Sequence, residues 1–399
     1  MNFSHRAAFP DGPNSLERTR RTLQASGRPI FNLSQSNPTQ TGLFFPSEVL
    51  ADALAAGSAR AYCPDPHGLA AAREAIAEHF ADSGLCLDPD RFFLCASTSE
   101  AYSYLFKLLC DPGDSVFVPQ PGYPLFDNLA QLESVRAVGY DLAYEHPYGW
   151  TIDIDALRAQ LESGESGRAK AIVLINPNNP TGSYVTEGEL AGIVALCKEH
   201  SLALIADQVF FDYPLDSRGA PVNFYGFDEV LTFVLDGFSK RLCLPQVKLG
   251  WTYVSGPEAE VRAAVGKLEI IADTFLSAGT PIMAAAVELL RREEEIQQLT
   301  RARMAEVMDV YRLELEGADS PHRILRCEGG WTALVQSPAL DEEEALAVDL
   351  LRRTGLYIHP GFFFDMRGGV FFAFSLIIRP EDAQRAARAY ADYFAQIGN

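Results

Sequence analysis

The chain has 399 residues, a hydrophobic content of 48% and a formal net charge of −20 at pH 7, with a pI near 4.8. This length exceeds the size at which one hydrophobic core usually stops growing, so we expect about two domains. The strong negative charge argues against nucleic acid or an anionic membrane surface as a partner and indicates a soluble protein.

The cysteines and the first residues indicate a cytoplasmic protein. The seven cysteines are odd in number and contain no CxxC pair, as is typical of reduced thiols. The opening residues MNFSHRAAFPDGPNS lack the apolar core of a signal peptide, and no stretch approaches the roughly 20 apolar residues of a membrane span. We expect Cys95, Cys110 and Cys197 in the core, and packing rather than reactivity for Cys243.

The first hundred residues are polar and turn-rich up to about residue 45, with helices predicted near 15–26, 46–58 and 69–80. Residues 92–110 then read as a strand, a tight polar turn and a helix. The turn carries Ser97, Thr98 and Ser99. The N–H groups at a helix N-terminus form an anion site, to which these hydroxyls could add. The same residues could equally serve as a helix cap.

Strands and helices continue to alternate through the middle of the chain. The pattern predicts a strand, a loop and a helix over 115–132, further elements at 134–142, 153–163 and 170–175, a helix over 187–200 and a strand over 202–206. Alternation of this kind indicates a mainly parallel sheet with helices packed on it.

Three apolar runs between Ala171 and Trp251 each end in a polar residue. Asn179 follows AIVLI, Asp207 follows ALIA, and Lys240 follows TFVLDGFS. Loops at the carboxyl ends of neighbouring parallel strands converge on one crevice. We therefore expect an amide, a carboxylate and an amine to meet at one site.

These three groups suit pyridoxal 5′-phosphate (PLP) as a cofactor. PLP needs an amine for a Schiff base, an acid beside its pyridine nitrogen and a polar partner for its ring oxygen. Lys240 would supply the amine, Asp207 would keep the ring nitrogen protonated, and Asn179 would donate to the 3-oxygen. Asp207 could instead be a turn cap, but a surface lysine fits poorly between VLDGFS and LCLPQVKLGW.

The sequence pattern in the last third of the chain predicts a smaller domain. A helix is expected over 257–271, followed by one long helix running to about Gly317 whose charged middle, RREEEIQQLTRAR, would face solvent. Strands near 323–326, 330–336, 356–359 and 370–376 and helices over 341–354 and 381–397 follow. We divide the chain into an N-terminal arm (1–45), a large domain (46–285) and a small C-terminal domain (286–399), and we expect part of the arm to join the small domain.

The order NNPTG, ADQVF and SKRLCLPQVKLGW resembles the fold-type I, class I/II aminotransferase family over nearly the whole chain. The resemblance implies an α/β fold with a mainly parallel central sheet, helices on both faces and a smaller α+β C-terminal domain. It implies a PLP-dependent aminotransferase that moves an amino group between an amino acid or amine and a keto acid through a Lys240 Schiff base. It also implies a homodimer with shared active sites.

The resemblance also implies roles for further residues. Tyr123 would stack on the pyridine ring. Ser97, Thr98, Ser99, Ser239 and Lys248 would hold the phosphate, and Tyr62 would reach the phosphate of a partner subunit. Tyr62 could instead be an ordinary core tyrosine, and Ser36 and Asn37, in the arm that crosses the site in relatives, could belong to an ordinary surface loop.

Several positions depart from the family pattern. Ser97 stands where glycine is frequent, Phe210 where a tyrosine normally shares the 3-oxygen, and Lys248 where an arginine normally grips the phosphate. Lysine binds as a point charge rather than with the two-pronged geometry of arginine. Ala373 stands where an arginine normally holds the substrate α-carboxylate. Arg379 and Arg241 are nearby in sequence, but neither occupies that position.

Ala373 leaves other functions open. The alternatives are a PLP-dependent lyase, decarboxylase or cyclase on the same fold, or a non-catalytic PLP-binding module. No DNA-binding segment accompanies the fold, which disfavours a regulator. A nicotinamide-dependent dehydrogenase is disfavoured because no GxGxxG motif opens a helix after a strand. The seven histidines form no cluster with metal-ligand spacing, so we expect no metal.

Overall fold

The predicted alternation of strands and helices is present in the structure, a computed structural model that describes residues 3–9, 12–216 and 219–398. The strands of the central sheet are β2 (Phe92–Cys95), β3 (Ser115–Gln120), β4 (Arg136–Glu145), β5 (Gly149–Ile152), β6 (Ala169–Ile175), β7 (Ala203–Asp207), β8 (Thr232–Gly237) and β9 (Gly250–Ser255). The helices are α1 (Ser15–Ala25), α2 (Ser47–Ser58), α3 (Ala70–Ala81), α4 (Thr98–Leu109), α5 (Phe126–Leu132), α6 (Ile154–Ser163), α7 (Glu187–His200), α8 (Phe238–Arg241), α9 (Glu258–Phe275), α10 (Thr280–Leu290), α11 (Glu293–Leu315), α12 (Glu343–Thr354) and α13 (Pro380–Ile397).

The central sheet is mainly parallel, as predicted. Within the described residues its eight strands run in the order β2-β9-β8-β7-β6-β3-β4-β5. The pairs from β8 to β4 are parallel, whereas β9, β2 and β5 pair antiparallel. The carboxyl ends of β6, β7 and β8 therefore lie side by side at one edge of the sheet.

Both faces of the sheet are covered, which explains its continuous apolar strands. On β6, Ala171, Val173 and Ile175 pack with residues of α4, α5 and α9. The alternate residues Ile172 and Leu174 pack with residues of α7 and belong to the larger of the two cores. Because successive side chains of a strand point to opposite faces of the sheet, the apolar residues of β6 contribute alternately to the two cores.

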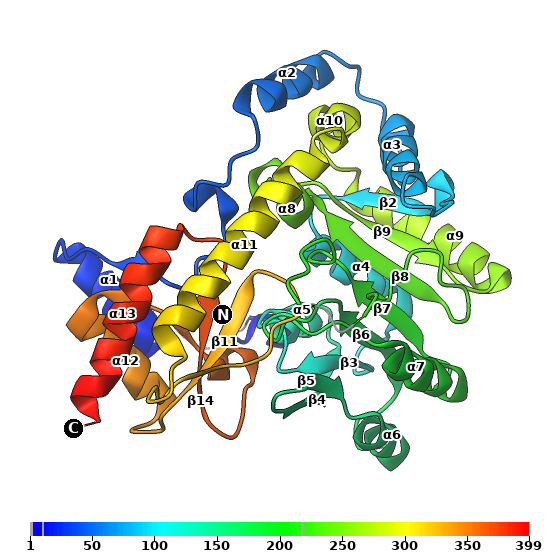
Figure 1. Cartoon of the computed structure of the whole chain (residues 1–399). Coiled ribbons are helices and arrows are strands. Elements are labelled where there is room, and N and C mark those ends of the chain that lie inside the picture. Colours follow the sequence, from blue (N-terminus) through cyan, green and yellow to red (C-terminus); the bar gives the residue numbers. More distant parts are fainter. Residues whose placement is uncertain (1–2, 10–11, 217–218, 399) are drawn as a thin grey trace.

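A smaller antiparallel sheet forms the second part of the chain, on the left of Figure 1. Within the described residues its four strands run in the order β10 (Arg323–Ile324), β11 (Thr332–Ser337), β14 (Val370–Ser375) and β13 (His359–Pro360). The arm joins this part, because β1 (Phe31–Asn32) pairs with β12 (Leu356–Tyr357) and α1 packs against α12. The fold class is confirmed, while the domain boundaries remain a prediction.

One predicted element was wrong. The single long helix expected to run to Gly317 is broken between α10 and α11, where Arg292 leaves helical geometry with φ −103° and ψ 4°. The break lets α10 pack on α2 and α3 while α11 packs on α13, and α11 crosses Figure 1 diagonally. The charged middle of this segment is also not wholly solvated, since Glu293 and Gln297 are buried.

Among the described residues, no helix combines the length and apolar character that crossing a membrane requires. In the same residues, no group of three or more histidine, cysteine, aspartate or glutamate side chains is arranged to hold a metal ion.

Candidate active site

The carboxyl ends of β6, β7 and β8 open onto a cavity of about 580 Å³. Asn179, Asp207 and Lys240 all line it. Asp207 is the last residue of β7, Asn179 follows β6 by four residues, and Lys240 lies on α8 directly after β8. The sheet topology thus brings together the three groups that the sequence analysis singled out.

Lys240 presents its amine to the cavity between two aromatic rings. Its Nζ atom lies 5.2 Å from the ring centroid of Phe210 and 4.9 Å from that of Trp331. Burial lowers the pKa of this amine to about 8, although the negative charge at Asp207 acts in the opposite direction. A lysine in this environment holds more neutral, nucleophilic amine near neutral pH than an exposed one does.

Asp207 is buried, with 8% of its surface exposed. Its Oδ1 atom accepts a hydrogen bond from the backbone N–H of Val209 at 3.2 Å, and its Oδ2 atom accepts one from the Tyr102 hydroxyl at 3.1 Å. Burial raises the pKa of Asp207 to about 6, even though both hydrogen bonds lower it. A carboxylate held in this way is suited to a buried cationic partner.

The N-terminus of α4 forms another wall of the cavity, lined by Ser97, Thr98 and Ser99. Ser97 is the N-cap, and its side chain accepts a hydrogen bond from the N–H of Glu100 at 3.3 Å. A Cβ atom at Gly250 would lie 3.3 Å from the backbone nitrogen of Thr98. Glycine at this point of β9 therefore lets β9 approach the first turn of α4 closely.

Ser239 and Lys248 complete the polar side of the cavity. Lys248 follows a 3₁₀ turn at Pro245–Val247 and adopts a left-handed conformation, with φ 58°. Few non-glycine residues adopt this conformation. Together with the start of α4, these residues offer backbone N–H groups, hydroxyls and a cation around one region, which suits a phosphate group.

Tyr123 and Phe210 also line the cavity. The ring of Tyr123 packs edge-on against Phe126, with 5.8 Å between centroids. Phe210 leaves the cavity without a hydroxyl at its position, and Tyr213 does not replace it. The Tyr213 hydroxyl is committed to the carbonyl oxygens of Lys240, at 2.6 Å, and Arg241, at 3.2 Å.

Tyr62 lies apart from the other predicted residues. It is not among those lining the cavity, and 67% of its surface is exposed. Of the two arm residues that the sequence analysis considered, Ser36 lines the cavity. The Asn37 side chain instead accepts hydrogen bonds from the backbone and hydroxyl of Thr39, so it shapes the arm.

The small sheet supplies the opposite wall, where Ala373 lies on β14 and His359 on β13. The basic side chains among the described residues that line the cavity are Lys240, Lys248 and His359, and no arginine is among them. Arg379 is exposed and caps α13. Arg241 is buried and pairs with Asp212, Asp236 and Glu293, so it does not serve a phosphate here.

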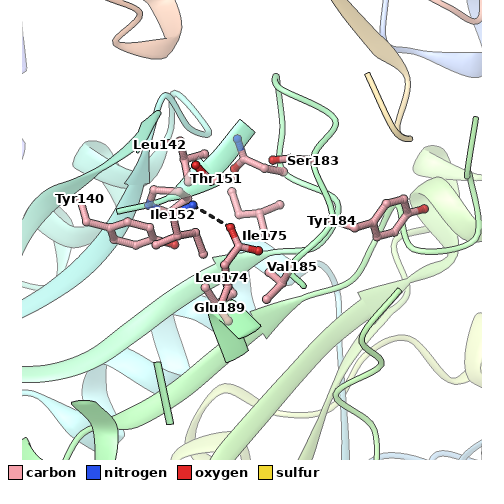
Figure 2. Close-up of a pocket in the computed structure, with 12 residues that line it drawn as sticks. Tyr140, Leu142, Thr151, Ile152, Leu174, Ile175, Ser183, Tyr184, Val185 and Glu189 are labelled. Atoms are coloured by element: carbon pink, nitrogen blue, oxygen red, sulfur yellow. Dashed lines mark hydrogen bonds between the residues drawn. The ribbon is translucent and has the colours of Figure 1, made fainter. Parts of the chain in front are cut away.

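A second, much smaller cavity of about 20 Å³ lies away from Lys240, between β4, β5, β6 and the start of α7. Figure 2 shows Glu189 at this place, bound to the backbone N–H of Ile152 at 2.7 Å. Asn178 also lines it, and its buried Oδ1 atom lacks a hydrogen-bond partner. A space of this size and polarity suits a single water molecule, which makes it a packing feature.

Comparison with known proteins gives a consistent result. The sequence profile of the family described as "Aminotransferase class I and II" matches residues 28–389. The glutamate-pyruvate aminotransferase AlaA of Escherichia coli K12 is 29% identical over 282 residues, covering 69% of this chain and 67% of that protein. The alanine aminotransferase of Mycobacterium tuberculosis H37Rv is 27% identical over 351 residues, covering 85% and 79% respectively.

Solved structures share the fold. An alanine aminotransferase from Pyrococcus furiosus superposes with a TM-score of 0.88 at 23% identity, covering 99% of this chain and 100% of that one. An aspartate aminotransferase double mutant from Thermus thermophilus gives a TM-score of 0.84 at 21% identity, covering 98% and 99%. The likeness therefore extends over both parts of the chain.

Proposed function

Because the chain belongs to the class I and II aminotransferases, an enzyme family that transfers amino groups, we propose that it does so with PLP held in the cavity around Lys240. The substrates are an amino acid or amine as donor and a keto acid as acceptor. The similarity to proteins named alanine and glutamate-pyruvate aminotransferases supports this pair of substrate classes.

The residues present fit the cofactor at each of its polar groups. Lys240 would be the amine that attaches it, Asp207 would pair with its ring nitrogen, and Asn179 would donate to its ring oxygen. The start of α4, with Ser239 and Lys248, would hold the phosphate, and Tyr123 would pack on the ring. Gly250 supports this assignment, because a Cβ there would press on the backbone nitrogen of Thr98, in the turn that would face the phosphate.

PLP, when bound, acts as an electron sink that stabilises negative charge at the substrate carbon bearing the amine. The chain supplies the proton transfers. When it is not attached to the cofactor, Lys240 Nζ would be the base that accepts the substrate α-proton and later returns a proton. Burial favours the neutral form of this amine, which is the form that can accept a proton.

Asp207 has a different task, which is to remain ionised beside a cation. Burial raises the pKa of Asp207 to about 6, against the lowering effect of its hydrogen bonds and of Lys240. A protonated ring nitrogen next to it would favour the carboxylate form. Asp207 therefore keeps that nitrogen protonated, and Lys240 and Asp207 together divide the acid–base work.

The observation that carries this proposal is the convergence of Lys240, Asp207 and Asn179 on one cavity. Borohydride reduction of the holoenzyme, followed by peptide mass analysis, should place the cofactor mass on Lys240. Incubation with a panel of amino acids and amines should release a keto acid together with the pyridoxamine form of the cofactor. Label on Lys248, or product without the pyridoxamine form, would contradict the proposal.

We also propose that the enzyme works as a homodimer in the cytoplasm. The exposure of Tyr62, outside the cavity of its own protomer, supports a role at a partner's phosphate. All seven cysteines are unpaired, which supports a reducing compartment.

A further inference from the structure

His359 and Ala373 lie directly opposite each other on neighbouring strands. β13 and β14 are antiparallel, with His359 in register with Ala373. Side chains of residues opposite each other in such a pair project from the same face of the sheet. Both residues line the cavity that contains Lys240, so the imidazole lies beside the space that the short side chain of Ala373 leaves open.

Ser34, from the N-terminal arm, holds this pair of strands in place. Its Oγ atom accepts a hydrogen bond from the His359 N–H at 2.8 Å and donates one to the carbonyl oxygen of Ala373. The backbone on both sides of the opening is therefore fixed by one hydroxyl. The hydrogen bonds of Ser34 therefore fix the backbone position of His359 relative to Ala373.

The ring of His359 packs among aromatic side chains. Its centroid lies 5.5 Å from that of Tyr357, 5.6 Å from Phe363 and 6.4 Å from Phe364. No hydrogen bond joins its ring nitrogens to another described residue, whereas the histidines His67 and His322 each have one. The ring is thus oriented by packing, and its nitrogens are available to a ligand in the cavity.

We propose that His359 is the specificity-determining residue that binds the carboxylate of the substrate, in place of an arginine at position 373. This inference rests on the proposed transamination of amino and keto acids. The substrate class is a carboxylate with an apolar side chain, because Trp331, Phe363 and Phe364 line the remaining wall.

A histidine in this role makes carboxylate binding depend on pH, unlike an arginine, which is always charged. Burial lowers the pKa of His359 to about 4 in the free protein. A bound carboxylate raises that pKa by favouring the imidazolium. Binding therefore takes up a proton at pH values between the free and the bound pKa, and affinity falls as pH rises through this window.

Other ionisable groups lie near His359, and the experiment must distinguish their proton uptake from that of His359. They are Tyr357 at its ring edge, Tyr123, Asp207, Lys240 and Lys248 along the same cavity, and Glu343 on α12, which packs against β13. Glu343 accepts hydrogen bonds from the backbone N–H groups of Phe362 and Phe371. Substitution of His359 leaves all of these groups in place.

Calorimetry of the holoenzyme with 3-phenylpropionate tests the proposal, because this carboxylate has no amine and cannot react. Titrations in two buffers of different ionisation enthalpy give the protons taken up. We expect uptake approaching about one proton near pH 6, none near pH 9, and affinity falling about tenfold per pH unit within the window. The neutral amide, 3-phenylpropionamide, should show neither effect.

Two variants complete the test. His359→Gln keeps a hydrogen-bond donor of similar length but should abolish proton uptake and the pH dependence, while His146→Gln, at an exposed position, should change neither. Proton uptake that persists in His359→Gln would overturn the proposal, as would pH-independent binding to the native protein. Because the ligand is inert, proton-linked binding without transamination would instead contradict only the proposed function.

Discussion

Tyr102 donates a hydrogen bond to Asp207, with 3.1 Å between its hydroxyl oxygen and Oδ2. Tyr102 lies on α4 and Asp207 at the end of β7, so the bond links the helix whose first turn lines the cavity to the strand that carries the carboxylate. Both side chains are buried. The bond favours the ionised carboxylate, because a tyrosine hydroxyl donates to it.

We therefore expect Tyr102→Phe to weaken cofactor binding without unfolding the protein. Loss of the donor should raise the pKa of Asp207 further above its usual range, so that less carboxylate is present to pair with a protonated ring nitrogen. A hydrogen bond to a charged group contributes about 1.5–3 kcal/mol, or roughly ten- to hundredfold in affinity. Equilibrium titration of apoprotein with PLP measures the effect, and it should be larger at pH 6 than at pH 8.

A matched control is Tyr104→Phe, two residues along the same helix and also buried. This tyrosine does not line the cavity, so PLP affinity should remain near the native value. Equal losses in the two variants would show that the effect comes from helix packing and not from the Asp207 hydrogen bond.

Phe210→Tyr should shift the pH at which the visible absorption band of the holoenzyme changes. The ring of Phe210 lies 5.2 Å from Lys240 Nζ, and a tyrosine there would add a donor beside the cofactor's ring oxygen. The added donor would make that oxygen less negative. The Lys240 nitrogen attached to the cofactor should then release its proton at lower pH. A spectrophotometric titration gives the midpoint, which we expect to fall by about one unit, equivalent to one hydrogen bond.

The neighbouring Phe211→Tyr supplies the comparison, because Phe211 does not line the cavity. Its midpoint should stay that of the native enzyme. A Phe210→Tyr midpoint that is unchanged or higher would refute the account, since Tyr213 is already bonded to the Lys240 carbonyl and cannot compensate.

Much of the fold could be predicted from local sequence patterns. Apolar runs such as AIVLI and ALIA are buried on both faces of the sheet, and runs of this kind are typical of parallel strands. Polar residues directly after such runs predicted where Asn179, Asp207 and Lys240 would gather. The inference was possible because strand ends in a parallel sheet converge, whatever the sequence distance between them.

Contacts between distant elements could not be predicted in this way. In the sequence, Tyr102 is one of several apolar residues in a predicted helix. Its hydroxyl reaches Asp207 only when α4 and β7 are brought together in the folded chain. The break before Glu293 could not be predicted either, because the charged sequence around it reads as continuous helix. Glu293 is buried against Arg241, which lies 52 residues away in the chain. His359 was missed because the register of β13 with β14 depends on the small sheet as a whole.

Tyr62 provides a test of subunit sharing. Its side chain is exposed and outside the cavity of its own protomer, and we expect its hydroxyl to complete the partner's phosphate site. Co-expression of a Lys240→Ala chain with a Tyr62→Phe chain should then form mixed dimers with one fully native site. Activity at limiting PLP should exceed that of either homodimer.

The reason is geometric, since the native site combines Lys240 of one chain with Tyr62 of the other. If Tyr62 acted within its own chain, both sites of the mixed dimer would carry a defect and no gain would appear. A fully active monomer, detected by sedimentation at assay concentration, would also contradict shared sites.

The substrate prediction follows from Ala373. An arginine at this position would give a carboxylate two parallel charge-assisted hydrogen bonds, and one such bond contributes about 1.5–3 kcal/mol. Arg379 is exposed and Arg241 is buried in ion pairs with Asp236 and Glu293, so neither replaces it. We expect alanine, aspartate and glutamate to react with low kcat/KM, although relatives are named for alanine and glutamate.

Ala373→Arg tests the point directly, because residue 373 faces a cavity of about 580 Å³ that has room for a longer side chain. The variant should raise kcat/KM for L-alanine by roughly ten- to hundredfold, as expected for one gained charge-assisted hydrogen bond. Ala373→Gln also adds a long side chain but no charge, and it should increase kcat/KM for L-alanine little. The comparison separates the effect of the charge from that of the filled space. Efficient turnover of ordinary amino acids by the native enzyme, with no gain in Ala373→Arg, would mean that a group other than His359 already binds the carboxylate strongly. Arg379→Ala would then be the next variant to measure, because Arg379 is exposed and follows the end of β14 closely along the chain.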